Sequence, residues 1–251
     1  MPTIKLPQAE LFYAAHCPSG ARRTLLLIHG AGGSHLTWPA ALRRLPETAV
    51  YTLDLAGHGR SQPPGRQTIA DYAQDVLDFI AALALENVFV LGHSLGGAVA
   101  QQVGLAAPPA VVGLILLGTG ARLRVSPQIL AAVEDDLATA VSLINQHLWG
   151  TQPAANLMGH NQQIMMGCPP EVLLGDFIAC NQFDLREKLP EIALPTLVIS
   201  SQQDQMTPPK FGEFLATHLP QAEFVLLPEA GHMMMLEEPE EVTRLVQNFL
   251  Q

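Results

Sequence analysis

The stretch that decides the fold reads VFVLGHSLGGAVAQQ and covers residues 88–102. Its first part is a short apolar run that is typical of a buried strand, and its second part favours a helix. Between the two, the segment GHSLG at 92–96 matches the pattern G-x-S-x-G. A serine on a tight strand-to-helix turn has strained backbone angles, and the two flanking glycines keep neighbouring side chains from colliding with it. We therefore predict that Ser94 is held out at the end of a buried strand.

Strand-like and helix-like segments alternate on both sides of this turn. The other short apolar runs lie at 24–28, 49–54, 112–117, 196–200 and 223–227, and residues 68–83 and 239–250 carry apolar side chains at helical spacing. Such alternation implies right-handed crossovers. The predicted fold class is therefore α/β, with a doubly wound, mostly parallel sheet whose binding crevice lies at the carboxyl ends of the strands.

The alternation breaks between residues 121 and 190, where no convincing strand occurs. A segment this long inside a compact domain carries its own structure or a function. We predict that 121–190 is an inserted helical cap over the crevice, and that 1–120 and 191–251 form the core. The acidic residues at 134–136 fit a solvated helix face.

Bulk composition narrows the class of protein. The chain has 251 residues, 48% of them hydrophobic and 14% charged, which suits one globular domain. Its net charge of −10 disfavours a nucleic-acid partner. The amino-terminal residues show no secretion or lipidation signal and no apolar run reaches the length of a membrane span, so we expect a cytoplasmic protein without stable membrane insertion, a monomer or homodimer. The three cysteines show no CxxC spacing, which argues against disulfides and zinc.

A serine hydroxyl needs a base, and the base needs an orienting carboxylate. The apolar run at 196–200 leads directly into SQQDQMTPP, which places Asp204 in the loop at its carboxyl end. The strand that precedes the cap ends without a carboxylate. Asp54 also follows a strand, but it lies before the serine and before a glycine turn, where an aspartate more often bonds local backbone. We therefore select Asp204 as the acid.

Nine histidines compete for the role of base. His232 alone follows the last strand, in a loop introduced by Gly231, after both the serine and the acid. The others lie in turns, in the cap, at a helix end or in loops after earlier strands, and His93 is expected to aim its ring away from the site. The chain order Ser, Asp, His favours His232 as the base.

Two backbone N–H groups must stabilise the oxyanion that forms on the substrate. Leu95 supplies one, at the amino terminus of the helix that follows the serine. The other is assigned to Ala31, because HGAGGS at 29–34 directly follows a strand and its small residues allow close approach. The same loop fails as a dinucleotide fingerprint, since His35 stands where the last glycine would be. With no Walker A or metal pattern either, we predict a reaction without cofactor or metal.

These motifs, in this order, resemble the α/β-hydrolase superfamily, and the resemblance covers most of the chain outside the cap. It rests on HGAGGS, DLAGHGRS, LGHSLGGAVA, SQQDQMTPP and EAGHMMMLEEP. It implies the α/β-hydrolase fold, with Ser94 as nucleophile, Asp204 as acid, His232 as base, and an oxyanion hole at Ala31 and Leu95. Many members have glycine two residues before the acid, where this chain has Gln202. A serine at the turn is unlike haloalkane dehalogenases and epoxide hydrolases, which have an aspartate there.

The leading functional hypothesis is a serine carboxylesterase that acts on small-molecule esters. Candidate pocket residues are Met206, Met233, Met234, Trp149, Leu157, Met158, Met165 and Met166, which together suggest an adaptable apolar pocket. Among them, Trp149, Met158, Met166, Met206 and Met233 are the predicted substrate contacts, although ordinary packing would also explain most of them.

Three alternatives stay open at this point. A lactonase or enol-lactonase, and a hydrolase of carbon–carbon bonds in ring-fission products, would use the same three residues. A dienoate substrate would require a cation near the serine, and the cap offers Arg122, Arg124, Arg186 and Lys188 only at its ends. The third alternative is a slow-turnover ligand receptor of the same fold, which would act through a partner protein.

Overall fold

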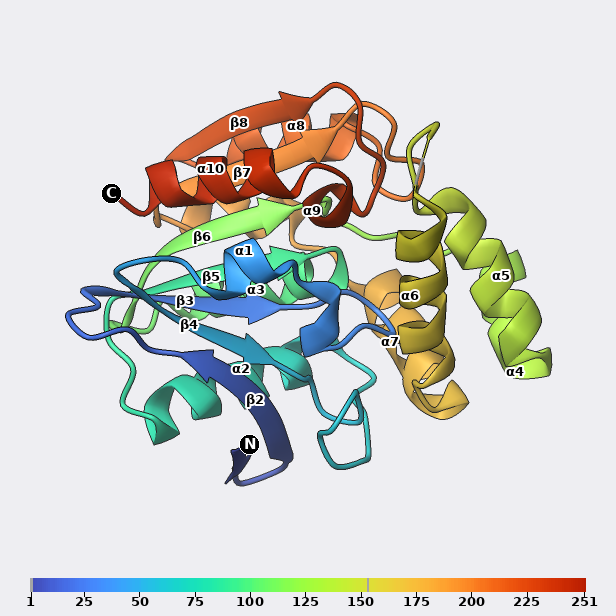
Figure 1. Cartoon of the computed structure of the whole chain (residues 1–251), viewed down its shortest axis with the longest axis horizontal. Helices are drawn as coiled ribbons and strands as arrows, with labels where there is room; N and C mark the ends of the chain where they lie inside the picture. The colour runs from blue at the N-terminus through green and yellow to red at the C-terminus, as the bar shows by residue number, and fades with distance from the viewer. Residues whose placement is uncertain (1, 153) are drawn as a thin grey trace.

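The computed structural model describes residues 2–152 and 154–251; residue 1 of the predicted core and residue 153 of the predicted cap lie outside this range. One sheet runs through the described chain in the strand order β1-β2-β4-β3-β5-β6-β7-β8 (Figure 1). Its strands are β1 (Thr3–Lys5), β2 (Glu10–His16), β3 (Arg23–Ile28), β4 (Thr48–Leu53), β5 (Val88–His93), β6 (Val111–Leu117), β7 (Thr196–Ser201) and β8 (Ala222–Leu227). Strands β3 to β8 pair in parallel, which confirms the predicted mostly parallel α/β sheet.

Strands β1 and β2 are missing from the sequence prediction. They pair antiparallel with each other, and β2 pairs antiparallel with β4 at the edge of the sheet. In β2 only Leu11 and Phe12 are fully buried, and its other residues are partly buried or exposed. Its apolar run, LFYAA at 11–15, contains no β-branched residue and therefore indicates a strand less clearly than the Val- and Ile-containing runs of the inner strands.

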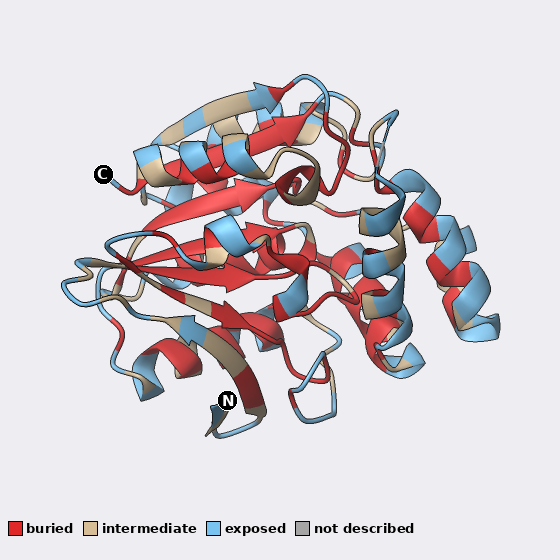
Figure 2. Ribbon diagram, viewed as in Figure 1, coloured by how far each residue is buried: buried red, intermediate tan, exposed pale blue. Residues whose placement is uncertain are grey.

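Helices cover both faces of the sheet (Figures 1 and 2). They are α1 (Ala40–Arg43), α2 (Ile69–Ala82), α3 (Leu95–Ala106), α8 (Lys210–His218), α9 (Met234–Glu237) and α10 (Pro239–Phe249), with 3₁₀ turns η1 (His35–Thr37) and η2 (Arg186–Glu191). Helices α2, α3 and α8 share one apolar core with Leu26, Val90 and Leu114, while α1, α9 and α10 share the other with Leu25, Leu91 and Ile115. Successive strand residues thus enter opposite cores, as the two-residue period of a strand requires.

Four helices lie between β6 and β7: α4 (Pro127–Asp135), α5 (Leu137–His147), α6 (Ala155–Met166) and α7 (Pro170–Gln182). We call them the inserted helices; Figure 1 shows them together at one end of the molecule, beyond the carboxyl ends of the strands. Asp136, expected on a solvated helix face, instead separates α4 from α5, and its carboxylate caps α5 by accepting from the Ala138 N–H. Within the described residues, no helix combines the length and apolarity that a membrane crossing needs.

The central strands give a direct stability test. Leu114 on β6 is fully buried, whereas Leu226 on β8 is 38% exposed. Leu114→Ala is expected to lower the free energy of unfolding by about 2–5 kcal/mol, because it leaves a cavity in a packed core. Leu226→Ala is the matched control and should change it by less than about 0.5 kcal/mol. Urea unfolding measures both values, and equal losses would contradict the assigned burial.

Candidate active site

Ser94 occupies the turn between β5 and α3 with φ 54° and ψ −116°. Few residues other than glycine adopt a positive φ, so the surrounding structure must hold this conformation. The Ser94 N–H donates to the Leu117 carbonyl over 3.0 Å, and the Ser94 carbonyl accepts from the Gly97 N–H and the Thr119 hydroxyl. The strained residue is thereby fixed between β6 and α3.

The two glycines of the GHSLG segment are required by close packing. A Cβ atom on Gly92 would collide with the Gly96 carbonyl, and one on Gly96 would collide with the Ile28 carbonyl at the end of β3. The clash that glycine avoids is therefore between backbone segments, rather than between the serine and its neighbours.

Asp204 lies in the loop after β7 and His232 in the loop after β8, as predicted. Their side chains meet, with 2.8 Å between Asp204 Oδ2 and His232 Nδ1. The Asp204 carboxylate also accepts from the backbone N–H groups of Met206 and Thr207 and from the Thr207 hydroxyl. Burial raises the pKa of this carboxyl, but the facing His232 and the hydrogen bonds outweigh burial and hold the pKa below its usual value. Asp204 is therefore an ionised acceptor for His232.

The hydrogen bond to Asp204 places the His232 proton on Nδ1 and leaves Nε2 as an acceptor in the neutral ring. The His232 side chain is buried, and it lines the same pocket as Ser94. A histidine in this state can accept a proton from a hydroxyl at its Nε2 atom.

His93 does not point away from the site, so that expectation is wrong. Its ring lies 4.6 Å from the His232 ring, centroid to centroid, and its Nε2 atom lies 3.0 Å from the His232 carbonyl oxygen. Burial, followed by the proximity of His232, lowers the pKa of His93 to about 3. The neutral ring therefore donates from Nε2 to the His232 backbone and stabilises the loop that carries His232.

The loop at 29–34 reaches the pocket through Gly30, Ala31 and Gly33. The Gly33 N–H closes the turn onto the Gly30 carbonyl, and the Gly32 N–H donates to Asp176 on α7. Within the described chain, neither the Ala31 N–H nor the Leu95 N–H donates to a protein acceptor. These are the two donors predicted for the oxyanion.

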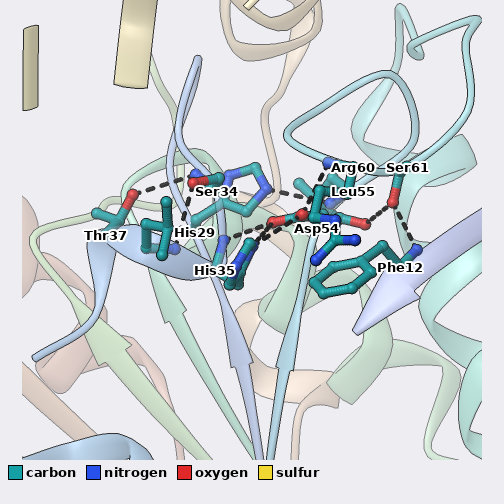
Figure 3. A network of polar contacts seen from close by, with 10 residues as sticks. Phe12, His29, Ser34, His35, Thr37, Asp54, Leu55, Arg60 and Ser61 are labelled. Atoms are coloured by element: carbon teal, nitrogen blue, oxygen red, sulfur yellow. Dashed lines mark hydrogen bonds and ion pairs between the residues drawn. The ribbon is translucent and has the colours of Figure 1, made fainter. Parts of the chain in front are cut away.

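Figure 3 shows polar contacts that join this loop to the residues after β4. Asp54 accepts from the nearby backbone N–H of Arg60, and also from the backbone N–H and Nδ1 of His35 in the loop after β3. His29 accepts from the Leu55 N–H at Nε2, so its Nδ1 donates to the Gly30 carbonyl. Burial, and next the charge on His58, lower the pKa of His29 to about 4. The neutral His29 thus joins the loop after β3 to the loop after β4.

The pocket encloses about 430 Å³ of space free of atoms, including the part open to solvent. Of the predicted substrate contacts, it brings Met206 and Met233 to Ser94. Trp149, Met158 and Met166 lie outside its lining; Trp149 is buried in the core, and the Met166 side chain is 42% exposed because α6 turns Met165 inward instead. The lining also includes Thr37, Ile144, Leu148, Asn161, Met165 and Phe177.

Sequence reasoning missed most of these lining residues, although it noted Met165. They come from η1 and from three of the inserted helices, and nothing in a helical sequence says which side faces a distant serine. Among the described residues, no group of three or more His, Cys, Asp or Glu side chains is arranged to hold a metal ion.

A parallel sheet that brings a strained serine, a histidine and a carboxylate together at its carboxyl edge is an arrangement that suits acyl-transfer chemistry. The family model for the alpha/beta hydrolase family matches residues 25–245. The chain therefore belongs to this family.

Individual relatives match this chain over nearly its whole length. The RutD protein of Caulobacter segnis, provisionally a carbamate hydrolase, is 30% identical, and the match covers 93% of each chain. A pimeloyl-[acyl-carrier protein] methyl ester esterase from Pectobacterium carotovorum is 30% identical over 92% of this chain and 96% of its own. The solved structure of a thermophilic esterase from Thermogutta terrifontis, with malate bound, superposes with a TM-score of 0.89 at 27% identity, covering 100% of this chain and 98% of the esterase.

The buried histidines predict how stability depends on pH. An unfolded histidine has a pKa of about 6.5, whereas those of folded His29 and His93 are about 4 and about 3. As the pH falls from about 6.5 towards 4, the unfolded chain takes up protons that the folded chain excludes. The free energy of unfolding should then fall by up to about 1.4 kcal/mol per pH unit for each of the two.

Above about pH 6.5, His58 should make the free energy of unfolding fall as the pH rises. Burial lowers the pKa of His58, but the facing Asp176 carboxylate raises it well above its usual value; Cys168, His29 and Tyr72 also face this ring. Its contribution is fully present below about pH 6.5 and is lost as the pH rises through the folded pKa. Urea midpoints at about pH 5, 6.5 and 8.5 should peak in the middle. A flat profile would contradict the assigned protonation states.

Proposed function

We propose that this chain is a serine carboxylesterase that hydrolyses carboxylic esters of small to medium apolar substrates. The observation that carries the proposal is the 2.8 Å contact between His232 Nδ1 and Asp204 Oδ2 beside a pocket that both His232 and Ser94 line. Relatives that include an ester hydrolase of similar length support the same reaction class.

In the proposed reaction, Ser94 Oγ attacks the ester carbonyl while His232 Nε2 takes the hydroxyl proton. The oxyanion accepts hydrogen bonds from the Ala31 and Leu95 N–H groups. His232 then gives its proton to the leaving alcohol, and the acyl group stays on Ser94. Water, deprotonated by the same nitrogen, attacks the acyl group, and the proton returns to Ser94 as the acid leaves.

Pocket composition supports an uncharged substrate. Apolar side chains line most of the cavity, with Thr37 and Asn161 among the polar ones, and none of its described lining residues is lysine or arginine. Arg122, Arg124 and Arg186 instead gather with Lys210 around a separate hollow that Phe211 and Phe214 also line. This favours an ester over the dienoate substrate of a carbon–carbon bond hydrolase, which would need a cation beside the serine.

The inserted helices serve as the cap in this proposal. Ile144 and Leu148 at the end of α5, Asn161 and Met165 on α6, and Phe177 on α7 contribute to the wall that faces Ser94. Their role is to exclude water from the acyl group and to limit its length.

Ser94→Ala tests the nucleophile. It should abolish turnover of p-nitrophenyl acetate and butyrate, a loss of at least about 10³-fold in kcat, because no acyl-enzyme can form. The Leu226→Ala protein, changed at an exposed site, is the control and should keep wild-type rates. Equal rates for wild type and Ser94→Ala would disprove the assignment.

Phe177→Ala tests the acyl wall. The wild type should prefer acetate or butyrate over decanoate esters, because bulky side chains of the inserted helices line the pocket. Removing the ring should raise kcat/KM for decanoate relative to butyrate by about tenfold, the effect of roughly one buried methylene. A p-nitrophenyl ester series of increasing length measures the shift, and an unchanged profile would place the acyl group elsewhere.

A further inference from the structure

Asp176 is a fully buried carboxylate on α7, one of the inserted helices, yet its hydrogen bonds reach the core. Its Oδ2 atom accepts from the Gly32 N–H over 2.9 Å and from His58 Nε2 over 2.8 Å. Its Oδ1 atom accepts from the Tyr72 hydroxyl over 2.6 Å. Gly32 directly follows Ala31, one of the two proposed oxyanion donors. A side chain of the insertion therefore binds the backbone beside that donor.

The same helix also packs on this glycine. Gly32 has φ +62°, and a Cβ atom added to it would lie 2.8 Å from Leu173 Cδ1. Leu173 and Asp176 are three residues apart on α7, so they lie on the same helix face. Gly32 is thus held by an apolar contact and by a carboxylate from one face of α7.

We propose that Asp176 is a positioning residue that sets the direction of the Ala31 N–H, and that His58 allows it to do so by neutralising its charge. This inference rests on the proposed function, because the Ala31 N–H matters only if an oxyanion forms at Ser94. It also makes the docking of α7 a condition for a complete oxyanion hole.

The charge of His58 is needed for an electrostatic reason. A lone carboxylate beside the oxyanion hole would repel the negative charge that develops on the substrate. His58 Nε2 lies 2.8 Å from Asp176, and its Nδ1 lies 3.1 Å from the Ala56 carbonyl oxygen. Both partners are acceptors, so both ring nitrogens donate and the ring is an imidazolium. Asp176 and His58 therefore form a pair with no net charge. Asp176 can orient the Gly32 N–H without placing a net negative charge beside the oxyanion hole.

Three near-isosteric variants separate orientation from charge: Asp176→Asn, His58→Gln and the double variant. His58→Gln leaves an unpaired carboxylate and should lower kcat by about 10- to 100-fold, comparable to the loss of an oxyanion donor. The double variant should recover much of that loss, because it keeps an oxygen acceptor for Gly32 and removes the charge. Asp176→Asn alone should lower kcat by about tenfold, with KM nearly unchanged, because a transition-state interaction is weakened.

Asp75→Asn is the matched control. Asp75 is also a buried aspartate in an ion pair, but it lies on α2 and bonds Arg66 instead of the loop at 29–34. The Asp75→Asn substitution should lower the free energy of unfolding, while kcat per active site stays at the wild-type value. Active sites are counted from the p-nitrophenol burst, so that loss of folded protein does not register as loss of kcat.

Hydrogen exchange of the Gly32 amide, followed by NMR, gives a readout that needs no turnover. Exchange should be slow in wild type and Asp75→Asn, and faster in Asp176→Asn. Unchanged Gly32 exchange in Asp176→Asn would overturn the proposed positioning role of Asp176. A double variant as slow in kcat as His58→Gln alone would overturn it as well. Absence of Ser94-dependent turnover in wild type would overturn the proposed function and the catalytic part of this inference. The exchange rate of the Gly32 amide would then still test its hydrogen bond to Asp176.

Discussion

The close approach of three backbone segments behind Ser94 is the constraint on which the rest of the site depends. Strand β5, helix α3 and the end of β3 meet at Gly92, Gly96 and the Ile28 carbonyl, where neither glycine has space for a side chain. Ser94 lies in this packed turn with a φ of 54°. The Ile28 carbonyl that Gly96 approaches is at the end of β3, where the loop at 29–34 begins. The turn and the proposed oxyanion loop are two results of one packing arrangement.

The buried histidines around that turn differ in protonation state, because burial and the facing groups shift their pKa values in different directions. Burial is the main cause that lowers the pKa values of His29 and His93, to about 4 and about 3, and both rings are therefore neutral. His58 is just as buried, but it faces the Asp176 carboxylate and keeps its proton. Each of the three joins segments that are distant in the sequence. The loops at the carboxyl edge of the sheet are therefore connected by polar contacts in a dry environment, where an unmet hydrogen bond would cost much.

The sequence identified the inner strands and the order of Ser94, Asp204 and His232 because those features are local. Continuous apolar runs indicate buried parallel strands wherever they occur, and a residue that follows such a run must lie at the sheet edge. Strands β1 and β2 are harder to recognise, because β1 has only three residues and the apolar run of β2 contains no β-branched residue. The direction of the His93 ring cannot be predicted locally, because it depends on a contact with His232, which lies far along the chain.

The sequence alone determined the inner strands of the sheet, the strained turn and the residues brought to the sheet edge, because strand and turn patterns depend on near neighbours. Tertiary structure alone decided which side chains of the inserted helices face Ser94. Met165 lines the pocket whereas Met166 next to it is exposed, and only the docking of α6 makes that difference. Tertiary structure also brought Asp176 to Gly32 and His58, from three separate segments. Helical spacing cannot encode such contacts, since it marks an apolar face without naming the partner.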